Sequence, residues 1–337
     1  MAGTRQLSPI LLPLRQHDRM GRTTGKSGTT ASTHAEQGTE VTIASMLDSP
    51  RQDDGYFGPG SATWKVIAHP AALNVGGGVA VLLQVLDPGE MRHLSRTTIA
   101  AEGGAAAESR FKRTGAYLIT VNFGDRAHAD AAAAHVDRLH ERSVHTDPET
   151  GVVTKAKTDE WMRWTHNTFV WGALTAAVAY GLELTPEERD RFVAEQHRCA
   201  ELLHVPGPLP GTWAELDRAI QEKGDRDAAL ILPAADIALS LRRPGGDGPL
   251  RRWIARNTQY GLLALLPEWA LRLYGIDRLD DRRIRSGRRW MGRFMRLAAR
   301  NRTMDRLIAD AAEEATVHPY QRIRTGAGAA GRQAQPA

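Results

Sequence analysis

The stretch TDEWMRWTHNTFVWGALTAAVAY, residues 158 to 180, decides the fold class of this chain. Thr158 is followed by two acidic residues, a pattern typical of a helix N-terminus because acids in the first turn complement the helix dipole. An apolar stripe then repeats at helical spacing through Met162, Phe169, Ala173, Ala176 and Tyr180. The stretch therefore predicts one long helix with a face in the core.

Two stretches contain no Asp, Glu, Lys or Arg, namely residues 66 to 86 and 164 to 182. Each approaches the length of a membrane-spanning helix. The first contains Pro70 and three glycines at 76 to 78, and the second contains Thr-His-Asn-Thr at 165 to 168, so each would need internal partners in lipid. We expect both to be buried core helices of a soluble, cytoplasmic protein.

The composition is that of a globular protein, with 42% hydrophobic and 25% charged residues among 337. The net charge is +5 and the pI is about 9.5, but only six of the 44 basic residues are lysine. An arginine, alanine and glycine bias of this kind is typical of a GC-rich coding sequence, and we expect no nucleic-acid partner. The N-terminal arginines are not followed by a hydrophobic segment, so we expect no signal peptide.

A single cysteine, Cys199, excludes an intrachain disulfide and fits a reducing compartment. No CxxCH motif occurs, so the usual covalent attachment of haem is excluded. Cys199 lies in HRCAELLH, which predicts an inert helix cysteine flanked by two ordinary histidines, His197 and His204.

The chain layout predicts an all-α fold with a single large helical domain from residue 51 to 325. Residues 1 to 50 are rich in Thr, Ser, Gly and charge, and together with residues 326 to 337 they predict disordered tails. Helix starts are marked at Asp125, Thr158, Thr185, Thr212 and Asp280. Thr185 and Thr212 are each followed three residues later by glutamate, the signature of a capping box.

In the helical run from Asp125 to His145, the position of each histidine around the helix axis shows whether it falls on the apolar or the polar side. One stripe contains Ala129, Ala132, Ala133, Val136, Leu139, Ser143 and Val144. His140 falls inside this apolar stripe, whereas His128 and His135 fall on the polar side and are expected to be solvated. His166 lies in the stripe of the next helix, so His140 and His166 form a pair able to face one shared cavity. The simpler alternative is that each hydrogen-bonds a backbone carbonyl in the core.

A basic cluster precedes these helices, because Arg110, Arg113 and Thr114 stand at i, i+3 and i+4 and share one helical face. The apolar residues after them suggest that this face points partly inward. A buried guanidinium needs an anion. A carboxylate elsewhere in the chain is the simpler partner, and a haem propionate is the other candidate.

An ordered set of motifs extends across the chain. They are FGPGSATWKV (57 to 66), GGGVAVLLQ (76 to 84), Pro88, His93-Leu94-Ser95, Arg110 to Thr114, FGD (123 to 125), His140 with His145, Trp164-Thr165-His166, LPGTWAEL (209 to 216) and ALLPEWALRLYG (264 to 275). In this order they resemble the family of MpaB and the latex-clearing proteins, the rubber oxygenases, over about residues 55 to 275.

The resemblance implies an enlarged globin-like helical core that holds one non-covalent b-type haem. His140 matches the proximal iron ligand of the family, and His145 and His166 match its second and third histidines. Arg110 and Thr114 match the family's arginine and threonine. These relatives use O₂ to attack isoprenoid double bonds. The resemblance therefore implies a haem-dependent oxygenase acting on a small apolar, unsaturated substrate.

Three departures from the family pattern concern the distal side of the haem and the catalytic base. Arg113 replaces a lysine that can cap the iron, and a guanidinium offers no lone pair, so the distal site is expected to hold water, hydroxide or nothing. Asp87 stands where the family usually has histidine. The proposed base glutamate is not at its expected spacing, from which Glu90, Glu102 and Glu108 all deviate. The alternative is a haem-binding sensor or carrier without turnover.

The helix expected from Asp280 to about Asn301 is strongly basic. Its charged stripe contains Arg282, Arg285, Arg289, Arg293, Arg296 and Arg300, and its apolar stripe contains Ile284, Met291, Phe294 and Ala298. Such a helix predicts peripheral contact with an anionic membrane or an acidic partner. The alternative is a solvated outer face on a packed helix. A basic adaptor for membranes or nucleic acid is a third reading of the whole chain, and the oligomeric state is not predicted.

Overall fold

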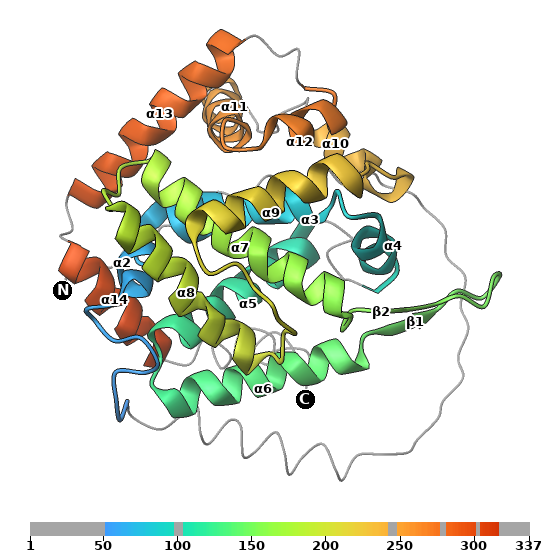
Figure 1. The fold of residues 1–337 in the computed structure, drawn as a ribbon. Helices are drawn as coiled ribbons and strands as arrows, with labels where there is room; N and C mark the ends of the chain where they lie inside the picture. The colour runs from blue at the N-terminus through green and yellow to red at the C-terminus, as the bar shows by residue number, and fades with distance from the viewer. Residues whose placement is uncertain (1–50, 98–103, 242–247, 277–280, 301–303, 317–337) are drawn as a thin grey trace, which may run out of the picture.

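The structure is a computed structural model that describes residues 51–97, 104–241, 248–276, 281–300 and 304–316. It is an all-α domain, as the sequence predicts (Figure 1). The elements in order are α2 (Ala62–Ile67), η1 (Ala72–Gly76), α3 (Gly77–Gln84), α4 (Pro88–Thr97), α5 (Gly104–Phe123), α6 (Arg126–Arg142), β1 (Val144–Thr146), β2 (Val153–Lys155), α7 (Asp159–Ala179), α8 (Pro186–Leu202), α9 (Trp213–Arg226), η3 (Leu232–Ala234), α10 (Ala235–Ser240), α11 (Pro249–Leu263), α12 (Glu268–Leu273), α13 (Asp281–Arg300) and α14 (Met304–Thr316). The predicted tails and Asp280 lie outside the described residues.

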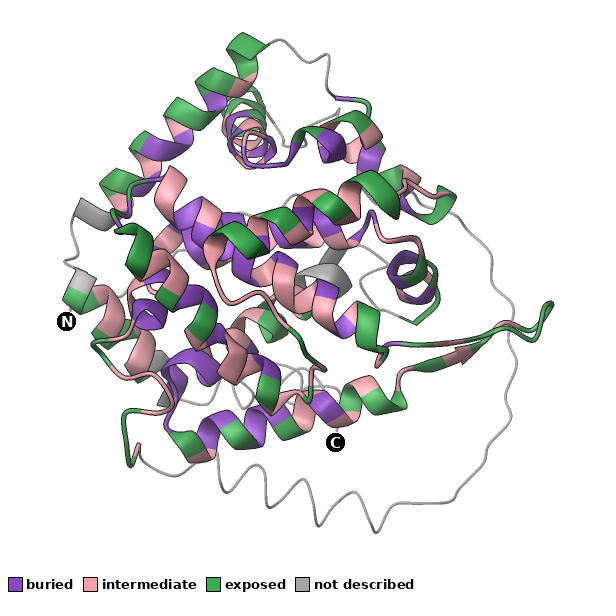
Figure 2. Ribbon diagram, in the orientation of Figure 1, coloured by how far each residue is buried: buried purple, intermediate pink, exposed green. Residues whose placement is uncertain are grey.

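Helix α7 runs through the middle of the molecule and contacts η1, α3, α8 and α9 (Figure 1). It begins where expected, because the side chain of Thr158 accepts a hydrogen bond from the backbone N–H of Trp161. Its buried residues include Trp164, Ala173 and Tyr180, and Figure 2 shows the helix largely buried along its length. The second uncharged stretch is thus a core helix.

The first uncharged stretch forms the end of α2, the π-helical turn η1 and α3, and it packs against α7. Gly76 and Gly172 lie backbone to backbone at this crossing, since a Cβ on Gly76 would come 2.7 Å from the Cα of Ala173. Within the described ranges, no single helix has the length and apolar character of a membrane span. Only the pair Ala72–Gln84 and Pro88–Thr97 reaches that character together, across a bend of 104°.

The predicted helix starts are confirmed wherever they are described. The side chain of Asp125 accepts a hydrogen bond from the backbone of His128 and begins α6. Thr185 and Thr212 both form complete capping boxes. These caps depend on residues only three positions apart, which is why the sequence indicates them reliably.

Three expectations about α6 are wrong. The helix ends at Arg142, and His145 lies on β1, which pairs antiparallel with β2 in a hairpin that the sequence analysis did not predict. His128, expected in solvent, is fully buried and hydrogen-bonds Asp125. Leu139, expected in the core, is 50% exposed. The cause is that α6 packs on α5 and α8 mainly along its first half, where Ala129, Ala131, Ala132 and Ala133 are buried.

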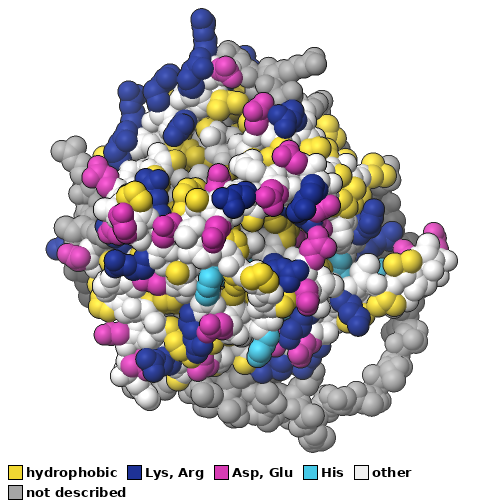
Figure 3. Space-filling view, viewed as in Figure 1, with side chains coloured by type: hydrophobic (Ala, Val, Ile, Leu, Met, Phe, Trp, Pro, Cys, Tyr) yellow, Lys and Arg dark blue, Asp and Glu magenta, His cyan; other side chains and the backbone are white. Residues whose placement is uncertain are grey.

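Helices α11 and α13 pack on one another at one end of the molecule (Figure 1). The contact is close because Gly287 faces Tyr260 and the neighbouring backbone. Met291 is buried, as its place in the predicted apolar stripe requires. The arginines of α13 that the structure places are exposed, and Figure 3 shows their side chains in a row along the helix.

Candidate functional site

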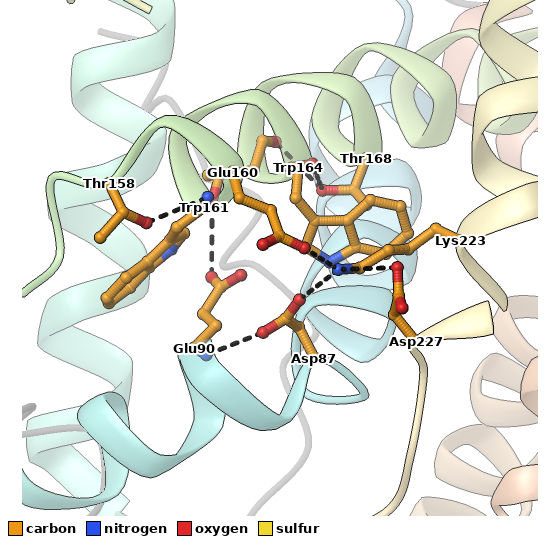
Figure 4. Close-up of polar contacts among 10 residues, drawn as sticks. Asp87, Glu90, Thr158, Glu160, Trp161, Trp164, Thr168, Lys223 and Asp227 are labelled. Atoms are coloured by element: carbon orange, nitrogen blue, oxygen red, sulfur yellow. Dashed lines mark hydrogen bonds and ion pairs between the residues drawn. The ribbon is translucent and has the colours of Figure 1, made fainter. Parts of the chain in front are cut away.

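A buried carboxyl group lies where α4, α5 and α7 come together. Asp87 accepts a hydrogen bond from the backbone N–H of Glu90 and so fixes the start of α4. The Glu90 side chain, only 3% exposed, accepts hydrogen bonds from Thr165 (3.4 Å) and from the side chain of Trp161 (Figure 4). Its second oxygen, Oε2, is buried and has no hydrogen-bond partner in the described part of the chain.

Burial raises the pKa of Glu90 well above its usual value, and the negative charge of Asp87 raises it further. Hydrogen bonds from Trp161 and Thr165 and the charge of Arg110 act in the opposite direction without cancelling the rise. Glu90 therefore keeps its proton to a higher pH than a solvated glutamate. A carboxyl group of this kind is suited to give or take a proton near neutrality.

Asp87 forms an ion pair with Lys223 of α9. The Lys223 ammonium lies 2.9 Å from Asp87, 2.5 Å from Glu160 and 3.9 Å from Asp227 (Figure 4). Both Lys223 and Asp87 are little exposed, with side-chain values of 12% and 13%. The ion pair stabilises a second negative charge next to Glu90, and this charge helps to keep Glu90 protonated.

Arg110 of α5 links the buried carboxyl to a histidine, because its charge acts on both Glu90 and His140. Partial desolvation, then repulsion from Arg113, lowers the pKa of Arg110, whereas Glu90 raises it. The prediction that this face of α5 points partly inward is wrong for its polar residues, because Arg110, Arg113 and Thr114 are all exposed. They do share one side of α5, where Thr114 donates a hydrogen bond to the Arg110 carbonyl at 3.1 Å.

His140 lies half-buried in the last turn of α6. Burial is the main cause that lowers its pKa; Arg110 and Lys157 add to the effect, and Asp137 opposes it. The neutral imidazole is therefore favoured. Its Nδ1 is buried without a hydrogen-bond partner in the described ranges, and the same holds for Nε2 of His145 on β1.

His93 of α4 fixes the hairpin that contains His145. Its Nε2 and Nδ1 hydrogen-bond Ser143 (2.8 Å) and Thr154 (2.9 Å), and its ring meets Trp161 edge-on at 5.1 Å. Burial, then the charge of nearby His145, lowers the pKa of His93. The hairpin is thus tied to the helix that carries Glu90, and the two histidines and the buried carboxyl belong to one neighbourhood.

His166 has a surrounding of its own on α7. It is partly buried on α7, and burial, then the charge of His197 on α8, lowers its pKa to about 4. No interaction joins His166 to His140 in the described residues, so their shared cavity stays a prediction. Cys199 is a desolvated helix thiol whose pKa burial raises to about 12, which agrees with an inert role.

The donor set was tested against a metal or haem cofactor. No group of three or more His, Cys, Asp or Glu side chains suited to a bare metal ion occurs in the described ranges. The orphaned imidazole nitrogens of His140 and His145 are different, because an unpaired buried polar atom costs about 1–3 kcal/mol. A neutral imidazole can donate its lone pair to iron, and Arg110 can pair with a carboxylate, so these residues fit a haem.

Glu90 is the functional candidate that sequence reasoning set aside. It lies off the spacing expected of the family's base glutamate, and an acid in the first turn of a helix is ordinarily explained by the helix dipole. Its burial depends on Trp161 and Thr165, more than 70 residues away. No local pattern in the sequence indicates that contact.

The comparisons with known proteins give one match. The family described as ER-bound oxygenase mpaB/B′/Rubber oxygenase, catalytic domain, matches residues 64–300 of this chain. The matched region begins in α2, ends with α13, and contains every site residue described above. Neither the search of curated proteins nor that of solved structures gave a significant match.

Proposed function

Because this chain belongs to the mpaB/rubber oxygenase catalytic-domain family, we propose that it is a haem-dependent oxygenase acting on an apolar, unsaturated chain such as an isoprenoid. The observation that carries the haem proposal is the pair of buried imidazole nitrogens, on His140 and His145, for which the described part of the chain offers no hydrogen-bond partner. His140 would be the iron ligand of a non-covalent haem b. His145, Arg110 and Thr114 would surround the cofactor, and His166 would line the cavity.

A bound haem would supply an iron at which O₂ can be activated. The protein's own contributions follow from the contacts above. His140 is kept neutral by burial, so its lone pair is available, and Arg110 is a fixed cation able to pair with a propionate. Glu90 would hold or release a proton at Oε2, while Thr165 holds Oε1.

A haem-binding sensor or carrier is the second candidate, and the observation that favours it is Arg113. This residue stands at the position of the family's lysine and is exposed. Against it, Glu90 supplies a buried acid–base group, which a carrier has no need of. Formation of product from a prenyl substrate distinguishes the two.

The test is an absorption spectrum of the purified full-length protein, with and without added haem. We expect a Soret band that is lost in His140→Ala and kept in His204→Asn. The control removes an exposed histidine and suits the positive φ of 53° at that position. A colourless protein that does not take up haem would refute the cofactor.

A second assay addresses turnover. The haem-loaded protein is incubated with a prenyl substrate, O₂ and a reductant, and oxidised products are measured. We expect products from the unmodified protein, and from Glu90→Gln at most about one hundredth of that rate, because general acid–base groups contribute about 10²–10⁴-fold. A normal Soret band without product from any protein would support the carrier.

A further inference from the structure

Positive charge is concentrated in α11 and α13. Together they contain eleven arginines and one acid, Asp281, a net charge of +10 in 35 residues. The whole chain has a net charge of +5, so the remainder has a net charge of −5. The basic character of the protein therefore belongs to this one helical pair.

Exposed apolar side chains lie on the same pair of helices. Leu250 is 68% exposed, Trp253 43% and Leu297 62%. Trp253 meets Trp290 edge-on at 5.8 Å, and Trp290 stacks on Phe294 at 5.4 Å. These five residues form what we call the apolar ridge. Exposed leucine and tryptophan next to one another have no role in a purely solvated face.

The two helices run antiparallel, which brings the ends of the apolar ridge together. Tyr260 of α11 lies against Gly287 of α13, and Trp253, two turns earlier on α11, lies against Trp290, further along α13. Because earlier residues of α11 lie beside later residues of α13, Leu250 and Leu297 lie at the same end of the helical pair. The ridge is thus one surface and not a set of scattered side chains.

The apolar ridge borders the arginines. At 100° per residue, Trp290, Phe294 and Leu297 occupy a strip of α13 next to its buried face. The adjacent strip on the solvent side contains Arg289, Arg293 and Arg296, all of them exposed. Figure 3 shows a row of basic side chains along α13. Arg289 and Arg293 have no acidic partner in the described part of the molecule. Their charges are available to an anion outside the protein.

We propose that the surface formed by the apolar ridge and the arginines of α11 and α13 docks on an anionic lipid bilayer. Arginines pair with lipid headgroups, and tryptophan and leucine enter the headgroup–acyl boundary. Charge alone would suit a nucleic acid equally well. The exposed leucines favour a bilayer, because a lipid bilayer provides an apolar region in which they can be buried and a phosphate backbone does not.

The experiment measures sedimentation of the full-length protein with vesicles of phosphatidylcholine alone or with about 30% phosphatidylserine. We expect binding only to the anionic vesicles, weakening steeply between about 0.1 and 0.5 M salt. Because each basic residue at such a surface contributes about fivefold to the affinity, Arg289→Gln/Arg293→Gln should bind about 30-fold more weakly. The matched control, Arg218→Gln/Arg226→Gln, removes two exposed arginines of α9 and should bind like the unmodified protein.

A second variant, Leu250→Ser/Leu297→Ser, tests the apolar ridge and should also lose anionic binding. Equal binding to both kinds of vesicle, no binding to either, or an equal loss in the control would overturn the proposal. So would binding to duplex RNA as tight as to vesicles, or self-association that depends on the leucines. The lipid and salt comparisons use the unmodified protein, so the test stands even if a variant does not fold.

Discussion

Replacing Glu90 by glutamine tests whether the buried carboxyl carries a proton. In the folded protein its pKa is raised well above the ordinary 4.5. At a pH between the pKa of Glu90 in the unfolded chain and its raised pKa in the folded protein, the folded state holds a proton that the unfolded chain has released. The free energy of unfolding therefore falls as pH rises, by about 1.4 kcal/mol per pH unit, until Glu90 ionises.

Glu90→Gln removes this dependence. Its amide keeps an oxygen for Thr165 and places an NH₂ where Oε2 lies, an atom with no hydrogen-bond partner among the described residues. Exchanging the carboxyl for an amide also changes the free energy of unfolding by about 1–3 kcal/mol, but this change is the same at every pH. Relative to the unmodified protein, the variant should gain up to about 2.7 kcal/mol between pH 5 and pH 7. The gain should level off at the pH where Glu90 ionises.

The assay is urea unfolding followed by circular dichroism at half-unit steps from pH 5 to pH 8. Other titrating groups, such as His93 and His140, contribute to both proteins and cancel in the difference. Glu149→Gln, an exposed carboxylate in the hairpin turn, controls for the loss of one charge. A stability difference that stays constant across this range would show that Glu90 is ionised in the folded protein and would refute the reasoning.

Three further results are expected. Gly76→Ala should lower the free energy of unfolding by about 3 kcal/mol, because its methyl group would lie 2.7 Å from the backbone of α7. The control Gly77→Ala, whose methyl group would meet nothing within 4 Å, should leave the stability unchanged. Equal losses in the two variants would contradict the close crossing. Lys223→Met should cost about 2–3 kcal/mol in urea unfolding because it leaves the little-exposed carboxylate of Asp87 unpaired, whereas exposed Lys155→Met should not. Equal stability of the two variants would refute the role of this ion pair. The haem-loaded protein should bind imidazole or cyanide readily in a spectral titration, since Arg113 offers no lone pair; a spectrum already showing two nitrogen ligands would contradict this.

The family and the fold class could be read from the sequence, together with the starts of α6, α7, α8 and α9. Caps such as Thr185 and Asp125 join residues three positions apart, and the core face of α7 follows from its apolar period. The same local phase failed at His128 and Leu139. It shows which residues share a helix face but not how much of that face a neighbour covers.

The candidate site was only partly predictable for the same reason. The sequence alone determined the helices, their starts and the arginine stripe of α13, because each depends on neighbours within one or two turns. Only the tertiary structure decided that Glu90 is buried against Thr165, that His93 holds the hairpin of His145, and that Trp253 meets Trp290. Those contacts join residues 37 to 75 positions apart. The burial, desolvation and pairing that give these side chains their chemistry arise only when distant helices pack together.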